Sequence, residues 1–413
     1  MKGVLVIVDG LGDLDCKILQ GRTPLQAANK PNLDEISRKS RLGFMYSIKE
    51  SVVPESDTAI VSILGNNPVL AERGQLEALG AGIKLERGDL ALRTNFATIE
   101  NLKGKVLDRR AGRTLTTKEA EALAKSINEQ VKLPCKFLFK STIQHRGVLV
   151  LKGGFSEDIS NTDPAYNEKG SFKHEDKFNF SHPTDDDENS KYTANIVNEF
   201  IEQSFGVLNG HSVNQERRKK GLLAANIILT RDAGIEIPKL KSMKKWLALA
   251  YMPLEIGIGK AASMDVLSFP YPELQEYDVY QNLHQGLLEA IGFFKMMINK
   301  KWQDYDYCYI HFKETDVPGH DNKPLEKKAM IELLDKEFFS WIGKIVEKEK
   351  MKLVVTADHS TPCKLKNHSA DPVPVLFYDG GEKDGFEFDE QNSKQGSLGK
   401  IYGQELLKKL EFV

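Results

Sequence analysis

The sequence predicts an α/β protein: a core built on a parallel sheet with helices on both faces, interrupted by a second, inserted α+β domain. Two observations carry this prediction. Continuous apolar runs bounded by turn residues cluster near the two ends of the chain, and a segment of different texture separates them. The length agrees with two domains, because 413 residues exceed what one hydrophobic core usually supports.

Four apolar runs are interpreted as buried parallel strands: residues 4–8, 307–312, 353–356 and 373–377. A helical pattern lies between the second and third runs. It begins at Pro324 and continues to Ile342, with apolar residues three and four positions apart. Strand, helix and strand in that order indicate a parallel sheet.

The middle of the chain has another pattern: a helical segment over 117–131, alternation over 147–151, and a polar stretch over 161–191. Within that stretch, the acidic run 184–188 is interpreted as a solvated loop, because it lacks the ligand spacing and glycine of a calcium loop. We therefore expect residues 1–85 and 262–413 to form one discontinuous, metal-binding phosphotransfer core. Residues 86–261 would form the inserted, substrate-binding lid domain.

Composition and charge exclude several classes of protein. The chain is 40% hydrophobic and 28% charged, with a net charge of −2 and a pI near 6.5, so no global field would attract nucleic acid or a membrane surface. No apolar stretch approaches the roughly 20 residues of a membrane-spanning helix, and the first run is too short for a signal peptide. The four cysteines form no CxxC pair, which favours a reducing, cytoplasmic location. A homo-oligomer is compatible with the sequence.

Polar side chains follow three of the predicted strands, where parallel sheets place their ligand sites. Taken singly, each is also explained by a turn or a helix cap. Together, three aspartates and three histidines supply the mixed ligands that two divalent cations require. The six residues are Asp9, Asp316, His320, Asp358, His359 and His368.

The segment from Asp316 to His320 is predicted to be a loop rather than a helix. Pro318 restrains Val317 away from the helical region, and Gly319 lets the backbone bend so that both ligands reach one ion. A nucleotide site is disfavoured, since no third glycine follows Gly10 and Gly12 at position 15 and no GxxxxGK[ST] run occurs.

Ser56 follows a proline turn and precedes the apolar run 60–64, a pattern typical of a helix start with Ser56 at the N-cap. The cap alone would explain the serine. The same position also suits a nucleophile, because a helix N-terminus offers N–H groups and a favourable dipole to a phosphate.

The chain resembles, nearly end to end, the archaeal-type cofactor-independent phosphoglycerate mutases of the alkaline phosphatase superfamily. The motifs that carry the resemblance are residues 8–13, 23–28, 31–34, 56–59, 108–113, 313–320 and 356–360. The resemblance implies an alkaline-phosphatase-like core and an isomerase of glycolysis and gluconeogenesis. It would interconvert 3-phosphoglycerate and 2-phosphoglycerate through a phosphoserine, without 2,3-bisphosphoglycerate.

The resemblance also implies roles for particular residues. Ser56 would be the nucleophile, and two divalent ions, Mn²⁺, Mg²⁺, Co²⁺ or Zn²⁺, would be bound. One would have the ligands Asp9, Ser56, Asp358 and His359, and the other Asp316, His320 and His368. Glu55 departs from the pattern, because a glycine is expected before the serine, and its bulk and charge would alter the approach of substrate.

The inserted domain is expected to hold the glycerate moiety, whose carboxylate and phosphate suit arginine forks. The candidates are Arg109, Arg110 and Arg113, followed by Arg146, Asp163 and Lys313. Two alternatives stay open: a phosphatase or another phosphomutase on the same scaffold, and a non-catalytic metal-binding protein in which Ser56 is only a cap.

Overall fold

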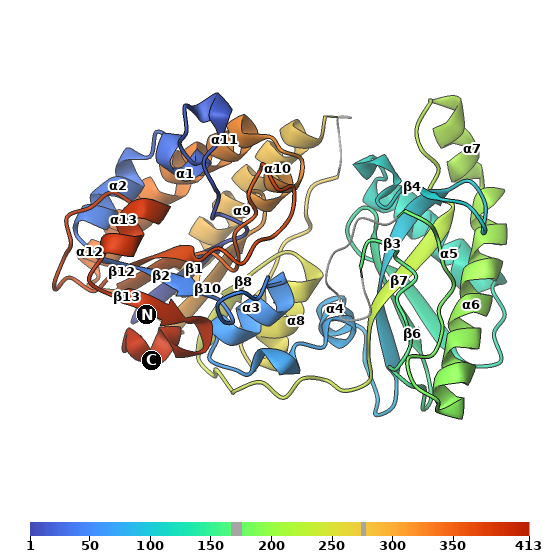
Figure 1. The fold of residues 1–413 in the computed structure, drawn as a ribbon. Helices are drawn as coiled ribbons and strands as arrows, with labels where there is room; N and C mark the ends of the chain where they lie inside the picture. The colour runs from blue at the N-terminus through green and yellow to red at the C-terminus, as the bar shows by residue number, and fades with distance from the viewer. Residues whose placement is uncertain (167–175, 274–277, 413) are drawn as a thin grey trace.

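The computed structural model describes residues 1–166, 176–273 and 278–412, and it contains two sheets that belong to two parts of the molecule (Figure 1). Both chain termini lie on the larger part, and the middle of the chain forms the smaller part beside it (Figure 1). The inserted α+β unit expected within an α/β core is therefore present.

The core sheet has eight strands, with β1 (Gly3–Val8) near its centre and fully buried along its length. In spatial order the strands are β13 (Gly399–Tyr402), β2 (Arg41–Tyr46), β12 (Val373–Tyr378), β11 (Lys352–Thr356), β1, β10 (Tyr307–Phe312), β8 (Trp246–Leu249) and β9 (Asp265–Leu267). Because β1 pairs in parallel with both β10 and β11, the carboxyl ends of these three strands meet at one edge of the sheet.

Of the eight strands in this sheet, β12 runs against its neighbours: it pairs antiparallel with β11 and with β2. The prediction that residues 373–377 form a parallel strand was wrong. An apolar run carries no information on direction. Residues 357–372 contain no helix to act as the crossover that a parallel strand requires.

Helices cover both faces of the core sheet, as expected (Figure 1). On one side lie α2 (Pro31–Arg38), α9 (Val279–Lys301), α11 (Pro324–Leu334) and α12 (Ser340–Lys348), with a π-helical segment (Asp335–Phe339) joining the last two. On the other side lie α3 (Ser56–Ile63) and α8 (Pro253–Ala261). The short helices α1 (Pro24–Ala27), α10 (Asp316–His320), α13 (Glu390–Gln395) and α14 (Leu406–Lys409) complete the core.

The inserted unit is a five-stranded antiparallel sheet with helices on one face. Its strands are β3 (Leu90–Ile99), β4 (Val106–Asp108), β5 (Phe137–Ser141), β6 (Arg146–Leu151) and β7 (Ile227–Gly234). The helices α5 (Thr117–Gln130) and α6 (Glu188–Asn209) pack on it around Phe96, Phe139 and Phe200, and α7 (Ser212–Lys219) follows. Helix α4 (Arg73–Gly80) contacts β3 and β7 and also α8, so it links the insert to the core.

The core resumes earlier than the expected boundary at residue 262. Strand β8 pairs with β10 in the core sheet, and Leu247, Leu249 and Ile258 belong to the core cluster. The prediction missed this return, although the continuous apolar run over 246–252, which contains β8, was an available signal. The segment 184–188 is exposed as predicted, and Asp187 caps α6 by accepting the Asn189 N–H at 2.7 Å. Among the described helices, none has the length and apolar character needed to cross a membrane.

Candidate active site

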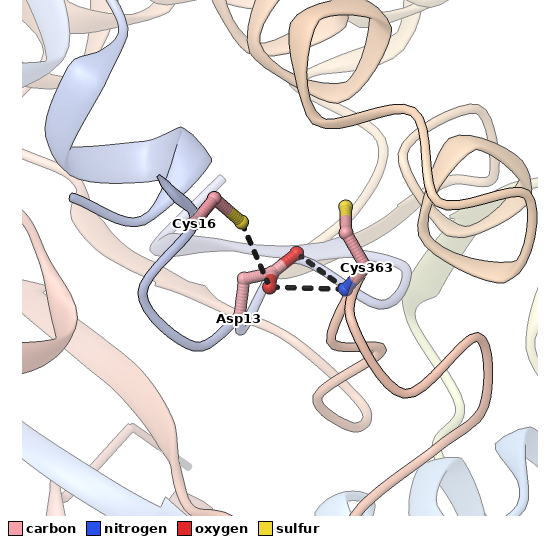
Figure 2. Close-up of side chains that lie close together, drawn as sticks. All are labelled: Asp13, Cys16 and Cys363. Atoms are coloured by element: carbon pink, nitrogen blue, oxygen red, sulfur yellow. Dashed lines mark hydrogen bonds between the residues drawn. The ribbon is translucent and has the colours of Figure 1, made fainter. Parts of the chain in front are cut away.

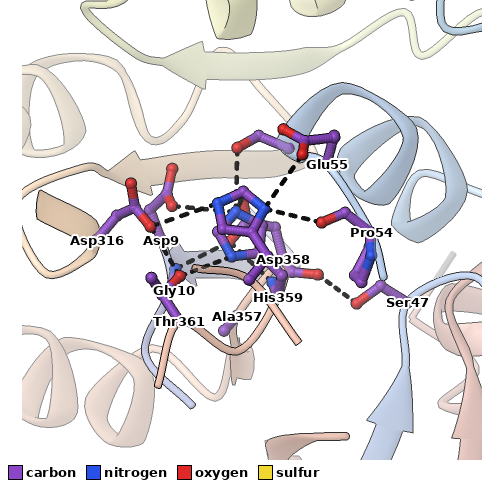
Figure 3. Close-up of polar contacts among 12 residues, drawn as sticks. Asp9, Gly10, Ser47, Pro54, Glu55, Asp316, Ala357, Asp358, His359 and Thr361 are labelled. Atoms are coloured by element: carbon purple, nitrogen blue, oxygen red, sulfur yellow. Dashed lines mark hydrogen bonds and ion pairs between the residues drawn. The ribbon is translucent and has the colours of Figure 1, made fainter. Parts of the chain in front are cut away.

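The residues predicted to bind metal come together at the carboxyl ends of β1, β10 and β11 (Figure 3). They form two adjacent clusters. One contains Asp9, Asp358 and His359, and the other contains Asp316, His320 and His368. The imidazole rings of His359 and His368 stack with their centroids 3.6 Å apart, so the clusters share a boundary.

The first cluster is buried, and Nε2 of His359 faces its oxygen atoms. This nitrogen lies 3.4 Å from Asp9 Oδ1, 3.3 Å from Asp358 Oδ2 and 3.2 Å from Ser56 Oγ. Asp9 Oδ1 and Asp358 Oδ2 accept no hydrogen bond from any described residue. Unpaired buried carboxylate oxygens are costly, and a divalent cation would satisfy both. The donor set therefore fits a metal ion.

The other oxygens of these two carboxylates are held by the protein. Asp358 Oδ1 accepts the backbone N–H groups of Gly10 at 3.1 Å and His359 at 3.0 Å. Asp9 Oδ2 contacts the ammonium group of Lys313 and lies 3.2 Å from His311 Nε2. Such contacts orient a ligand so that its free oxygen points to the ion.

In the second cluster, both imidazole rings present Nε2 to Asp316. The distances are 3.4 Å from His320 to Oδ2 and 3.7 Å from His368 to Oδ1. Each ring places Nδ1 against a backbone carbonyl, that of Lys366 at 3.1 Å and that of Pro54 at 3.0 Å. Because a carbonyl only accepts, Nδ1 carries the proton in both rings and Nε2 is available to a metal when the ring is neutral.

Residues Asp316–His320 form the short helix α10, so the prediction of a loop was wrong. Pro318 is the third residue of this helix, and an N–H in the first turn has no partner within the helix. Proline is tolerated there, and one helical turn brings Asp316 and His320 onto the same side.

The electrostatics differ among the three histidines. Burial lowers the pKa of His359 to about 3 and that of His368 to about 4. Burial would also lower the pKa of His320, but the Asp316 carboxylate outweighs it and raises this pKa to about 9. Burial alone would raise the pKa of Asp316, whereas the neighbouring imidazoles, His320 foremost, hold it well below its usual range.

Ser56 is the first residue of α3, and the N-cap position belongs to Glu55. The prediction that Ser56 is the N-cap was therefore wrong by one position. Its hydroxyl points to His359 instead of capping the helix. An explanation of Ser56 as a simple cap is not supported. Glu55, where a glycine was expected, lines the pocket in front of the serine, and burial raises its pKa.

A cavity of about 170 Å³ lies between the metal-ligand clusters and the inserted domain. On the core side it is lined by Ser56, Lys313, Asp316, His320 and His368. On the opposite side lie arginines that include the predicted Arg109, Arg110, Arg113 and Arg146. The predicted nucleophile and the predicted anchors thus face one space.

Two of the predicted anchors also have protein partners. Arg109 donates two hydrogen bonds to Asp163, at 2.6 and 2.5 Å, so Asp163 orients an arginine and does not itself line the cavity. Arg113 pairs with Asp321 of the core at 2.5 Å, directly after α10. This ion pair crosses between the inserted domain and the end of α10, the helix that carries Asp316 and His320.

Three largely buried arginines of the cavity, Arg73, Arg93 and Arg231, were not predicted from the sequence. Arg93 and Arg231 stand opposite each other on β3 and β7, an arrangement that is unfavourable for like charges unless nearby anionic groups offset it. Each Nε lies near a carboxylate without a well-aligned hydrogen bond among the described residues: Glu77 Oε1 is 3.5 Å from Arg73 and 3.3 Å from Arg93, and Asp232 Oδ2 is 3.6 Å from Arg231. Burial, followed by the charges of Arg231 and Arg73, lowers the pKa of Arg93 to about 9. For Arg93, the single charge in the buried strand β3 was the available signal.

Asp13, Cys16 and Cys363 form a further group of ligand-type side chains that lie close together (Figure 2). Its carboxylate is already engaged, since Asp13 accepts the Cys363 N–H at 3.1 and 3.2 Å and the Lys327 ammonium at 2.8 Å. Burial raises the pKa of Cys16 to about 11, which disfavours the thiolate that a metal needs. We assign this group a structural role.

The fold and the two clusters define a metal-dependent enzyme, and the comparisons with known proteins agree. The family model described as the Metalloenzyme superfamily matches residues 258–412. The model described as 2,3-bisphosphoglycerate-independent phosphoglycerate mutase matches residues 37–214.

Relatives of that name span almost the whole chain. The one from Pyrococcus furiosus is 40% identical over 98% of this chain and 95% of its own length. The one from Methanopyrus kandleri is 38% identical over 98% and 94%. The chain belongs to the family of 2,3-bisphosphoglycerate-independent phosphoglycerate mutases, which are isomerases.

Two solved structures are similar over the full chain. A protein from Pyrococcus horikoshii is 31% identical with a TM-score of 0.72, covering 100% of this chain and 98% of that one. The cofactor-independent phosphoglycerate mutase from Thermoplasma acidophilum is 30% identical with a TM-score of 0.58, covering 100% and 99%. The predicted family and fold class are confirmed.

Proposed function

We propose that the protein interconverts 3-phosphoglycerate and 2-phosphoglycerate by passing the phosphoryl group to Ser56 and back to the other hydroxyl of the same glycerate. The observation that carries this proposal is the position of Ser56 Oγ. It lies 3.2 Å from His359 Nε2 and lines a cavity whose opposite side holds arginines.

Two divalent ions are part of the proposal. Asp9, Asp358, His359 and Ser56 would hold one, and Asp316, His320 and His368 the other. When bound, such ions lower the pKa of a serine hydroxyl and stabilise the attacking and leaving oxygens of an in-line displacement. Mixed carboxylate and imidazole donors suit Mn²⁺, Co²⁺ and Zn²⁺, and Mg²⁺ is also a candidate.

The protein supports Ser56 in two ways. The N-terminus of α3 directs free N–H groups and the positive end of the helix dipole toward a phosphoryl group on Ser56. Before an ion binds, the lone pair of His359 Nε2 can orient the Ser56 hydroxyl when Nδ1 carries the proton; a bound ion would take that lone pair. Near the same helix end, Arg73 also lines the cavity, and its guanidinium group lies 3.8 Å from the buried carboxylate of Asp57 in α3.

The arginines would hold the charged groups of the substrate. Arg93 and Arg231 line the cavity, and their guanidinium groups suit a carboxylate or phosphate of the substrate. Arg109 is oriented by Asp163, and Arg110 and Arg146 complete the lining. On the core side, Lys313 lies between Asp9 and Glu255, 3.2 Å from Glu255 Oε1.

Transfer back to glycerate must outrun hydrolysis of the phosphoserine. The inserted domain lies across the cavity from Ser56, so it acts as a lid that excludes water and keeps glycerate at high effective concentration. The first phosphoryl group comes from the substrate, so added 2,3-bisphosphoglycerate is not required.

The test uses 3-phosphoglycerate labelled in both its phosphate and its carbon skeleton, mixed with unlabelled substrate. The proposal expects both labels to stay together in the 2-phosphoglycerate formed. Scrambled labels would exclude transfer within one bound glycerate, and inorganic phosphate as the main product would identify a phosphatase on the same scaffold.

A further inference from the structure

We propose that Thr361 is a positioning residue that sets the tautomer of His359 and joins the two metal-ligand clusters through one chain of hydrogen bonds. Its Oγ1 lies 2.7 Å from Asp316 Oδ1 in one cluster and 3.1 Å from His359 Nδ1 in the other (Figure 3). The inference rests on the proposed roles of Asp316 and His359 as metal ligands.

The direction of each hydrogen bond in this series follows from the number of protons available. A carboxylate that ligates a metal is ionised and can only accept, so the single hydroxyl proton of Thr361 goes to Asp316. Oγ1 then faces His359 with a lone pair, and Nδ1 of His359 must carry the ring proton. Nε2 is left unprotonated, and it is the atom that faces Asp9, Asp358 and Ser56.

The surrounding backbone is built around this side chain. A Cβ at Gly10 would lie 2.6 Å from Thr361 Oγ1, and one at Gly319 would lie 2.8 Å from its Cγ2, so two glycines make room for it. The Thr361 N–H donates to the Gly12 carbonyl at 3.0 Å, and its carbonyl accepts the buried Lys327 ammonium at 3.0 Å. Thr361 is fully buried and held from both sides.

Removing the hydroxyl has a definite consequence. Without Oγ1, Nδ1 of His359 loses its acceptor, and the ring can take the tautomer with the proton on Nε2. That proton would point at Asp9 Oδ1 and Asp358 Oδ2, which lie 3.4 and 3.3 Å away, and a cation would have to displace it. Loss of a partner behind a metal-ligating histidine typically costs about 10- to 100-fold in metal affinity or activity.

The experiment compares three variants of the full-length protein. Thr361→Val keeps the shape but removes the hydroxyl, and Thr361→Ser keeps the hydroxyl. Thr356→Val is the matched control, since Thr356 is equally buried but its Oγ1 bonds to the Pro374 carbonyl at 3.0 Å, away from the clusters. The readouts are the ¹⁵N shifts of His359 in metal-free, histidine-labelled protein and the affinity for Mn²⁺ by calorimetry.

We expect the wild-type protein, Thr361→Ser and Thr356→Val to show His359 protonated on Nδ1. Thr361→Val should lose this preference and bind Mn²⁺ about 10- to 100-fold more weakly. A wild-type His359 protonated on Nε2 would overturn the proposal without any variant, and so would equal losses of affinity in the valine and serine variants. The tautomer of the metal-free protein tests the hydrogen-bond chain independently of whether Ser56 carries phosphate.

Discussion

The affinity of the Asp316, His320 and His368 cluster for a divalent ion should depend strongly on pH, and the dependence should come from one residue. In the metal-free protein the Asp316 carboxylate raises the pKa of His320 to about 9. A histidine must be neutral to ligate a metal, so this proton has to leave when the ion binds. His368, with a pKa of about 4, is already neutral near pH 7 and contributes no proton.

The magnitude follows from the fraction of His320 that is neutral. With a pKa of about 9, that fraction is about one in a hundred at pH 7 and about one in eleven at pH 8. The apparent affinity should therefore rise about ninefold over that interval, with about one proton released per ion bound. The stability of the metal-free fold depends on pH in the opposite direction. A raised pKa means that the ion pair stabilises the fold below the unfolded pKa near 6.5, and this contribution is lost as pH rises through about 9.

Calorimetric titration with Mn²⁺ at several pH values, in buffers of different ionisation enthalpy, measures both the affinity and the protons released. A His320→Gln variant is the control, because it has no proton to lose there and its weaker binding should lack the slope. An affinity that is constant from pH 7 to pH 8, or binding without proton release, would refute the reasoning.

Four other predictions concern activity. Ser56→Ala should abolish mutase turnover while the midpoint of urea unfolding barely moves, because the hydroxyl caps no backbone group; a stability loss well above the roughly 1 kcal/mol of a helix cap would point to a structural role instead. Asp163→Asn should weaken the paired contact to Arg109 and raise KM for phosphoglycerate with unchanged metal content. Steady-state kinetics with metal analysis measures both quantities, and an unaltered KM would contradict the prediction. Arg93→Gln together with Arg231→Gln should weaken substrate binding severely, because two guanidinium groups that line the cavity are lost; thermal unfolding with and without substrate measures this, and an undiminished stabilisation by substrate would contradict it. Chelation should abolish turnover and Mn²⁺ should restore it, so full activity after thorough demetallation would count against a metal role.

Much of the metal centre was predictable from the sequence, because its ligands follow recognisable strands. The runs that became β1, β10 and β11 are apolar and buried, and Asp9, Asp316 and Asp358 come shortly after their ends. Since adjacent parallel strands end at one edge, the order of residues along the chain was enough to bring these side chains together. Two divalent ions, their identity, the cytoplasmic location and the oligomeric state stay predictions.

Local patterns failed where direction or context decided the outcome. The same apolar run serves a parallel or an antiparallel strand, so the direction of β12 was not encoded in residues 373–377. Pro318 disfavours a helix in general, yet it is tolerated in the first turn of α10. Strand β8 is short, and its pairing with β10 assigns it to the core.

The sequence by itself determined the two-part α/β architecture, the candidate metal-binding residues and the candidate nucleophile, since these depend on patterns within short segments. Only the tertiary structure decided which groups face the cavity. Arg93 and Arg231 become a candidate anion-binding pair because β3 and β7, far apart in the chain, lie side by side. Thr361 becomes the link between the two clusters because β10 and β11 both flank β1, which brings Asp316 within reach of its hydroxyl. Such contacts join residues distant in sequence, and the free energy of burying unpaired polar groups, which selects their partners, is set only when the chain has packed.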